Sequence, residues 1–286
     1  MSDGLSYLSA IKPGPVPTSL AASEEEEINL FQRLLTEIKS WKNNPASYRP
    51  VHWFLYNNHV TSVLQGLHNP VCGLVGLEMA AELLRRSDST MPVFSTNQIL
   101  DHAVDMGITK HGEIFSAYDL CILATSLFNC KATVIDSNLK SKHKLLLETI
   151  LSGLPVLLAY DSDRNFSPCL NKGHSAHWAL VTGFVIRNTD FIPTDISEKL
   201  EIGENVLHKL NKGSAILPHL LENALSHTYV YVKQGKSLKS RLWPLQLLLN
   251  SNANLIEKDP KKNWENYFCP YNLEHTLANR FIVLSP

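Results

Sequence analysis

Two apolar segments in the middle of the 286-residue chain constrain its fold more than any other feature. Leu154–Tyr160 (LPVLLAY) is nearly all apolar, and Trp178–Ile186 (WALVTGFVI) follows it after a polar loop that contains a glycine. Short runs of this kind are typical of strands buried inside a sheet, and neither is long enough to span a bilayer. We therefore expect the two segments to be antiparallel neighbours.

Most of the helical patterns come before these strands. Apolar residues recur at helical spacing over Cys72–Arg86, and Lys140–Ser152 returns to the same pattern. Further helices are predicted at Asn97–Met106, Ala117–Phe128 and Trp243–Asn252, and further strands at Lys131–Asp136, Thr228–Lys233 and Arg280–Leu284. An order of helices first and strands afterwards favours an α+β fold with segregated layers over a wound α/β sheet.

The domain boundaries follow from changes in composition. Residues 1–22 carry three prolines among small polar residues, which predicts a flexible leader. Residues 23–286 have the length and apolar content of a single large domain. Within it, residues 187–227 begin with a polar stretch and resemble an insertion between two strands.

Charge and cysteine content exclude several classes of protein. Lys and Arg number 26 against 27 Asp and Glu, so neither a nucleic-acid surface nor an anionic membrane surface is indicated. The first residues lack the basic and apolar regions of a signal peptide. An odd number of scattered cysteines without a CxxC pair indicates a reducing compartment, so we expect a cytoplasmic protein. The cysteines are Cys72, Cys121, Cys130, Cys169 and Cys269.

Cys72 is the candidate nucleophile. It begins an amphipathic helix, where free backbone N–H groups and the helix dipole lower the pKa of a thiol. Taken alone it would more often be an inert buried cysteine. Gln65 lies seven residues upstream, close enough for its side-chain amide to fold back and stabilise an oxyanion together with the Cys72 N–H. The competing interpretation of Gln65 is an exposed loop residue.

His177 is the candidate general base. It stands at the entrance of the second apolar strand, where an imidazole is held rigidly and can face a cleft. His174 is the weaker alternative, because it falls in the preceding loop. For the group that orients the imidazole we prefer the side-chain amide oxygen of Gln234, which follows a strand, over Asp190 in the insertion. Cys169, His174 and His177 also spell C-x4-H-x2-H, but no fourth zinc ligand is evident, so no metal is expected.

Three ordered blocks carry a family resemblance: NPVCGLVGLEMA, GHSAHWALVTGF and YVKQGKS. With these blocks, residues 50–286 resemble the actin maturation protease family, which is related to the bacteriocin-processing cysteine peptidases. The resemblance implies a papain-like fold without a cofactor, with the nucleophile at a helix start packed on an antiparallel sheet that carries the histidine. It matches Cys72 to the family nucleophile and His177 to the family histidine. The bacteriocin-processing relatives have an aspartate where Gln234 stands, so the third group differs in charge.

The function implied by this resemblance is that of a cysteine aminopeptidase that removes the N-acetylated first residue from immature actin. Two alternatives use the same fold: an acyltransferase or transglutaminase-like enzyme with the same Cys–His pair, and a catalytically silent binding module. Some family members have a long proline-rich leader suited to profilin. Here the leader has only Pro13, Pro15 and Pro17, which argues against that partner.

Lysines near the predicted base suggest how an acidic actin N-terminus would be bound. Lys172 precedes His177 by five residues, and Lys233 and Lys236 flank Gln234. We expect these three lysines to bind substrate. The alternative is that they are solvated loop charges, which contribute little in salt.

Overall fold

The computed structural model describes residues 20–41, 51–66, 70–136, 139–188, 199–214, 221, 224–269 and 271–286. The chain divides into two compact units, Met1–Pro45 and Ala46–Pro286. Helix α1 (Leu20–Trp41) belongs to the first unit, and all the other elements belong to the second. The predicted boundary after residue 22 and the predicted single peptidase domain stay predictions.

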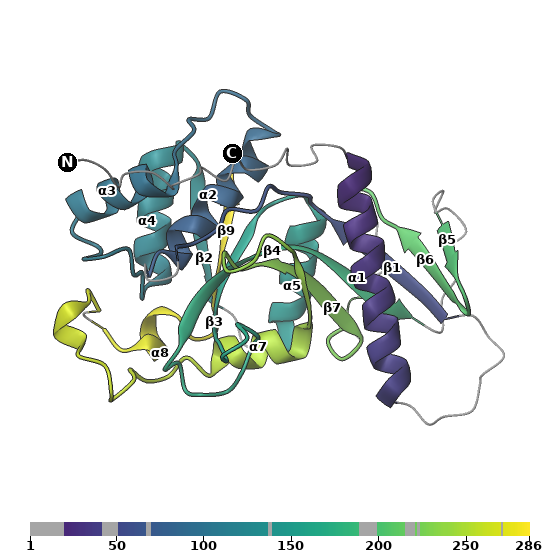
Figure 1. The fold of residues 1–286 in the computed structure, drawn as a ribbon. Helices are drawn as coiled ribbons and strands as arrows, with labels where there is room; N and C mark the ends of the chain where they lie inside the picture. The colour runs from purple at the N-terminus through teal and green to yellow at the C-terminus, as the bar shows by residue number, and fades with distance from the viewer. Residues whose placement is uncertain are drawn as a thin grey trace, which may run out of the picture. The chain divides into compact units, whose positions relative to one another are not determined.

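In the second unit, helices and strands come largely in separate runs along the chain (Figure 1). Its helices are α2 (Cys72–Arg85), α3 (Thr96–Asp105), α4 (Ala117–Phe128), α5 (Leu139–Leu151), α7 (Leu245–Ala253), the 3-10 helix η1 (Trp264–Asn266) and α8 (Leu273–Thr276). Its strands are β1 (Val51–Asn57), β2 (Lys131–Asp136), β3 (Val156–Asp161), β4 (Ala176–Asn188), β5 (Lys199–Ile202), β6 (Asn205–Lys209), β7 (Thr228–Lys233), β8 (Arg241–Pro244) and β9 (Arg280–Ser285).

The described strands form one nine-stranded sheet. Its order is β2-β9-β3-β4-β1-β6-β5, and β7 pairs with β4 and with β8 beside this path. All pairs are antiparallel except β1 with β6. The predicted antiparallel pairing of the two apolar segments is confirmed, with Leu157 of β3 opposite Leu180 of β4.

Helices cover both faces of this sheet, as the alternation of side chains along β3 shows. Leu157 and Ala159 belong to a buried cluster with α2, α3 and α4, whereas Leu158 and Tyr160 belong to a second cluster with α5 and α7. Because successive strand residues point to opposite faces, the two clusters lie on opposite sides of the sheet. The predicted α+β fold, with a helical layer against an antiparallel sheet, is confirmed.

Strand β4 is the longest strand and changes partner along its length. It pairs with β3 up to Val181 and with β1 from Gly183 onward, and its register with β7 shifts between these two residues. A Cβ atom at position 183 would lie 2.3 Å from the carbonyl oxygen of Tyr56, so only glycine lets β1 approach this closely. The partner change allows one strand to hold both halves of the sheet.

Several elements differ from the sequence predictions. β1 has no predicted counterpart, and β5 and β6 lie inside the predicted insertion, where β6 pairs with β1. The helix predicted from Trp243 begins two residues later at Leu245, because Trp243 and Pro244 pair with β7. The predicted bounds of α4, β2 and β7 agree with the structure.

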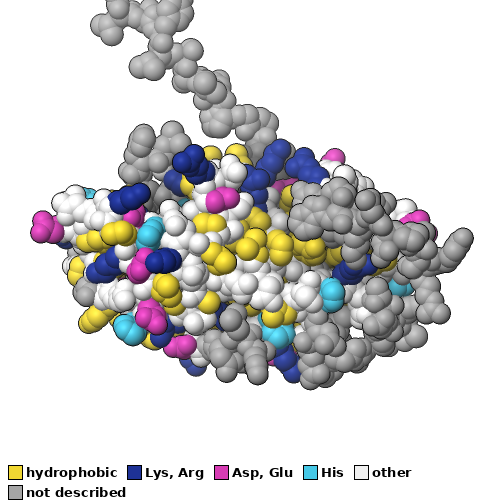
Figure 2. Space-filling model, turned by 90° about the horizontal axis from the view of Figure 1, so that it is seen from below, with side chains coloured by type: hydrophobic (Ala, Val, Ile, Leu, Met, Phe, Trp, Pro, Cys, Tyr) yellow, Lys and Arg dark blue, Asp and Glu magenta, His cyan; other side chains and the backbone are white. Residues whose placement is uncertain are grey.

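Side chains of both charges are scattered over the face shown in Figure 2, with hydrophobic groups between them. This mixture agrees with the nearly balanced charge of the sequence. None of the described helices is long and apolar enough to cross a membrane.

Candidate active site

Cys72 is the first residue of α2, as predicted. The first helical hydrogen bond joins the Val75 N–H to the Val71 carbonyl at 2.9 Å, so the N–H groups of Cys72–Leu74 precede the helical ladder. Such groups favour an anion at the helix start. A Cβ atom at Gly73 would lie 3.1 Å from Trp178, so glycine permits the close contact between α2 and β4.

His177 is the second residue of β4 and lies opposite Tyr160 of β3. Its Nε2 atom is 2.7 Å from the main-chain carbonyl oxygen of Gln234. Because a carbonyl oxygen can only accept, Nε2 carries a hydrogen, and Nδ1 is left to face Cys72. The rings of Tyr160 and Phe166, with centroids 5.6 and 5.9 Å from that of His177, shield the imidazole, which is 7% exposed.

Cys72 and His177 shift each other's pKa in opposite directions. Burial raises the pKa of the Cys72 thiol, but the charge of His177, a hydrogen bond with its ring and the N–H groups of Trp178 and Gly73 lower it below 9.0. Burial lowers the pKa of His177, but the Cys72 thiolate, their hydrogen bond and the Gln234 carbonyl raise it above 6.5, against an opposing effect of Lys236. These shifts favour a thiolate–imidazolium pair.

The group that orients His177 differs from the predicted one. The sequence analysis assigns the side-chain amide oxygen of Gln234, whereas the structure uses its main-chain carbonyl. The side-chain oxygen instead accepts a hydrogen bond from the Lys236 N–H at 3.0 Å. The physical reason is that β7 ends at Lys233, so the Gln234 carbonyl no longer pairs within the sheet and points to the imidazole. The alternative orienter, Asp190, lies outside the described residues.

Gln65 lines the same cleft as Cys72. Its N–H donates to the Gly235 carbonyl at 2.7 Å, which ties this loop to the residue after Gln234. Gln65, Cys72 and His177 all line one cleft. The structure therefore brings together the predicted nucleophile, the predicted base and the predicted oxyanion donor.

The predicted substrate-binding lysines are only partly brought together. Lys236 lines the cleft. Lys172 forms an ion pair with Glu257, with 3.2 Å between Nζ and Oε1, and does not line the cleft. Lys233 is 7% exposed, and its Nζ donates to the Ser62 hydroxyl at 2.7 Å, again without lining the cleft. Both corrections arise because a lysine close in sequence to the site can point away from it.

The cleft has a volume of about 240 Å³ and combines apolar with cationic side chains. Ile114, Phe115 and Leu277 contribute apolar surface. Lys262, which the sequence analysis does not identify, also lines the cleft, and its Nζ donates to the His174 carbonyl at 3.1 Å. Lys262 lies 85 residues beyond His177 in the chain, so no local pattern connects the two.

Among the described residues that line the cleft, Glu113 is the one carboxylate, and the sequence analysis also misses it. It is 2% exposed and accepts hydrogen bonds from the N–H groups of Lys110, His111 and Phe268 at 2.8–3.0 Å. Burial raises the pKa of Glu113, but the hydrogen bonds from these backbone N–H groups lower it by more, so the pKa lies below 4.5. Its negative charge is therefore used to hold two loops.

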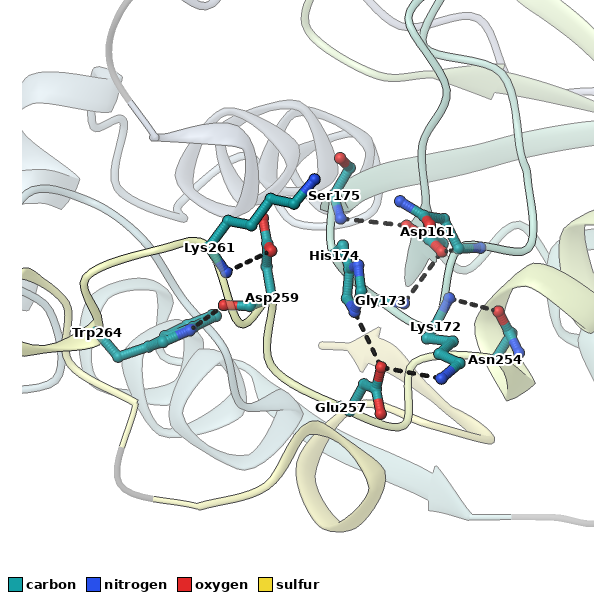
Figure 3. A network of polar contacts seen from close by, with 11 residues as sticks. Asp161, Lys172, Gly173, His174, Ser175, Asn254, Glu257, Asp259, Lys261 and Trp264 are labelled. Atoms are coloured by element: carbon teal, nitrogen blue, oxygen red, sulfur yellow. Dashed lines mark hydrogen bonds and ion pairs between the residues drawn. The ribbon is translucent and has the colours of Figure 1, made fainter.

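The loop before His177 is fixed by the buried carboxylate of Asp161, at the end of β3 (Figure 3). Asp161 accepts hydrogen bonds from the N–H groups of Asn171, Gly173 and Ser175, the last two at 3.0 and 3.2 Å. Fixing this loop sets where β4 begins and hence where His177 stands. The signal was present in the sequence as an aspartate that ends an apolar strand.

The alternative histidine and the zinc motif are not assembled at the cleft. His174 Nε2 is 3.0 Å from Glu257 Oε1 (Figure 3), whereas His177 contacts the Gln234 carbonyl. Burial and the nearby Asp161 and Asp163 raise the pKa of Cys169 to about 11. Within the described ranges, His, Cys, Asp and Glu form no group of three or more that could hold a metal ion.

Comparison with known proteins identifies a family model and several relatives in sequence. The family model "Actin maturation protease-like, C-terminal domain" matches residues 60–185. Proteins named actin maturation protease from Xenopus tropicalis, Danio rerio and Homo sapiens are 34%, 30% and 31% identical over 87%, 82% and 82% of this chain. The matches cover 79%, 76% and 67% of those proteins. A putative C39-like peptidase from Bacillus anthracis is a distant structural neighbour, with a TM-score of 0.41 at 10% identity, over 80% of this chain and 98% of that one.

Proposed function

This chain belongs to the actin maturation protease family, and from that premise we propose that it is a cysteine-type aminopeptidase that removes the N-acetylated first residue of immature actin. Cys72 is the nucleophile and His177 the general base. The observation that carries the proposal is the hydrogen-bonded Cys72–His177 pair with opposite pKa shifts, in a cleft whose described lining residues include no uncommitted carboxylate. The reducing cytoplasm is the compartment we propose for it.

In the first step, the Cys72 thiolate attacks the carbonyl carbon of the acetylated first residue. The electron pair of the C=O bond moves to the oxygen, where the N–H groups at the start of α2 and the Gln65 amide stabilise the negative charge. The imidazolium of His177 gives its Nδ1 proton to the leaving amine as the C–N bond breaks. The products are a thioester on Cys72 and actin with a new, free N-terminus.

In the second step, neutral His177 accepts a proton at Nδ1 from a water molecule, whose oxygen attacks the thioester carbon. The C–S bond then breaks, the acetylated amino acid leaves, and the sulfur regains the thiolate form beside imidazolium. The Gln234 carbonyl keeps Nε2 protonated in both steps, so Nδ1 is the atom that exchanges protons.

The charges of the cleft support a blocked substrate. A free N-terminal ammonium needs a carboxylate, but Glu113 is already bound by backbone N–H groups of two loops. An acetylated N-terminus is neutral and has no such need. Lys236 and Lys262, both lining the cleft, are placed to attract acidic residues that follow the scissile bond.

The size of the cleft supports the release of a single residue. Its volume of about 240 Å³ is below the range of about 300–1,000 Å³ that is typical of pockets for drug-sized ligands. Ile114, Phe115 and Leu277 give it an apolar wall suited to an uncharged first side chain.

The test compares a peptide that begins acetyl-Met-Asp-Asp with its unacetylated form. We expect release of acetyl-methionine from the first alone, and none with Cys72→Ala or His177→Ala. Lys236→Glu and Lys262→Glu should lower kcat/KM for the acidic peptide about tenfold, whereas Lys261→Glu, next to the cleft residue Lys262, should not. Equal cleavage of both peptides would reject the proposed preference for an acetylated N-terminus. Mass spectrometry of actin N-termini, with and without the protein, extends the test to the whole substrate.

A further inference from the structure

We propose that the catalytic cleft continues into a neighbouring hollow that binds the substrate chain downstream of the scissile bond, and that this segment carries an apolar side chain beyond its first acidic residues. The inference rests on the proposed function. The hollow has a volume of about 730 Å³ and lies against α3. It is larger than the catalytic cleft, so a substrate that ended at the cleft would leave most of the available surface unused.

The two spaces adjoin each other, since they share lining residues. Pro70 and Tyr267 line both the cleft and the hollow. The segment 110–115 runs along both: Lys110 and His111 line the hollow, and residues 113–115 line the cleft. This segment spans at most about 17 Å when extended, so about five residues of substrate can follow it from one space into the other.

The junction is preformed by the buried carboxylate of Glu113. It accepts the N–H groups of Lys110 and His111 from the floor and that of Phe268 from the opposite loop, next to Tyr267. The Trp178 ring N–H donates to the Ile114 carbonyl at 2.8 Å and fixes the same floor beside the catalytic pair. A path held by buried hydrogen bonds does not have to be ordered when substrate binds, which lowers the cost of binding.

The direction of the substrate follows from the proposed reaction. An enzyme that removes one residue has only that residue, with its acetyl group, upstream of the scissile bond. The catalytic cleft has room for such a group, so any substrate chain in the hollow must be the downstream part. The hollow therefore determines which protein N-termini are accepted, because their later residues have to fit it.

The lining of the hollow defines the chemistry of that segment. Leu100 and Val104 of α3 form its apolar wall, and Val104 is 45% exposed although it belongs to a hydrophobic residue type. Asp101 and Asp105 flank this wall, and Lys110 and His111 also line the hollow, so its polar rim carries groups of both charges around the apolar wall. Close to Cys72 the cleft has Lys236 and Lys262 instead. The fitting chain is therefore acidic next to the bond and apolar about three to five residues further on.

Binding to the inactive Cys72→Ala protein provides the test, because it does not depend on turnover. Two fluorescent acetylated peptides share their first four residues, acetyl-Met-Asp-Asp-Asp. The apolar one continues with Ala-Leu-Ala-Leu-Ala, and the polar one continues with five serines. We expect the apolar peptide to bind about tenfold more tightly, as burial of one aliphatic side chain predicts. Adding Val104→Glu should remove most of this difference.

The matched control is Val93→Glu, because Val93 is also an exposed valine, at 69%, and does not line the hollow. It should keep the preference for the apolar peptide. Equal affinity for the two peptides, or a preference that survives Val104→Glu in a protein with an unchanged thermal transition, would overturn the inference. If the active protein cleaved both peptides with equal kcat/KM, the proposed function would stand, but the role of the hollow in substrate binding would be rejected. If neither peptide were cleaved, the proposed function would be rejected, and the binding experiment would still show whether the hollow binds the apolar segment.

Discussion

Selective alkylation of Cys72 tests the catalytic pair without any substrate. The pKa of Cys72 lies below 9.0, whereas burial together with nearby acidic residues raises that of Cys169 to about 11. At pH 7 a thiol with a pKa of 11 has about a hundredth of the thiolate of one with a pKa of 9. The more basic thiolate is intrinsically more nucleophilic, which restores a factor of about eight. Cys72 should therefore react at least about tenfold faster than Cys169.

Cys121 should react more slowly still. Burial, and to a smaller extent Cys130, raises its pKa to about 12, which gives a rate at least about 40-fold below that of Cys72 by the same reasoning. Cys169 is the sharper comparison, because it is partly exposed like Cys72 and differs from it mainly in its surroundings. Limiting iodoacetamide followed by peptide mapping measures all five cysteines in one experiment.

The pH dependence identifies the cause of the reactivity. The lowered Cys72 pKa and the raised His177 pKa define a window in which the ion pair exists, so labelling of Cys72 should persist on the acid side of pH 9.0. In His177→Ala the burial of the thiol remains but the opposing charge is lost, so labelling at pH 6–7 should fall and recover only at alkaline pH. The assignment of Cys72 and His177 as the catalytic pair would be refuted if Cys169 were labelled before Cys72. It would also be refuted if the unchanged protein and His177→Ala gave identical pH profiles.

Two further predictions concern the groups around the pair. Gln65→Ala should lower kcat by about 10²–10³ if its amide binds the oxyanion, whereas Gln234→Ala, which keeps the main-chain carbonyl, should lose less than about tenfold; the reverse order in steady-state assays would contradict both roles. Asp161→Asn should lower the stability by about 1–3 kcal/mol and reduce kcat, because an amide cannot accept all three N–H groups of the loop; thermal unfolding should show no such loss for Asp163→Asn, and an equal loss would contradict the prediction.

The parts of the fold with strong local patterns were predictable from the sequence. Helix α4 and strand β7 have clear periodicity and bounds that agree with the structure. Strand β1 depends on partners more than a hundred residues away, in β4 and β6, and its sequence, interrupted by His52 and ending at Asn57, shows neither strict alternation nor an unbroken apolar run. Pro244 marks the start of α7, but only its pairing with Tyr229 shows that a strand precedes it.

The residues of the candidate site also fall into two groups, those that a local sequence pattern indicates and those that only tertiary packing brings to the cleft. Cys72 and His177 were predictable because a helix start and a strand entrance are local features. The role of the Gln234 carbonyl was not predictable, because every residue has a main-chain carbonyl. Only the end of β7 shows which carbonyl no longer pairs within the sheet. Lys262 and Glu113 reach the cleft from loops that are brought together by tertiary packing, and Lys233 shows the converse, a nearby lysine whose side chain is buried elsewhere.

The uncharged group behind His177 has a consequence for the timing of the reaction. The Cys72 thiolate is the anion that holds the His177 pKa up, while burial and Lys236 act to lower it. In the reaction that we propose, Cys72 loses its charge when it becomes a thioester, and a carbonyl, unlike a carboxylate, does not replace that charge. The imidazole then favours its neutral form at the stage when a base is needed to activate water. In this mechanism, acylation of Cys72 changes His177 from a proton donor to a proton acceptor, and release of the product restores the proton donor.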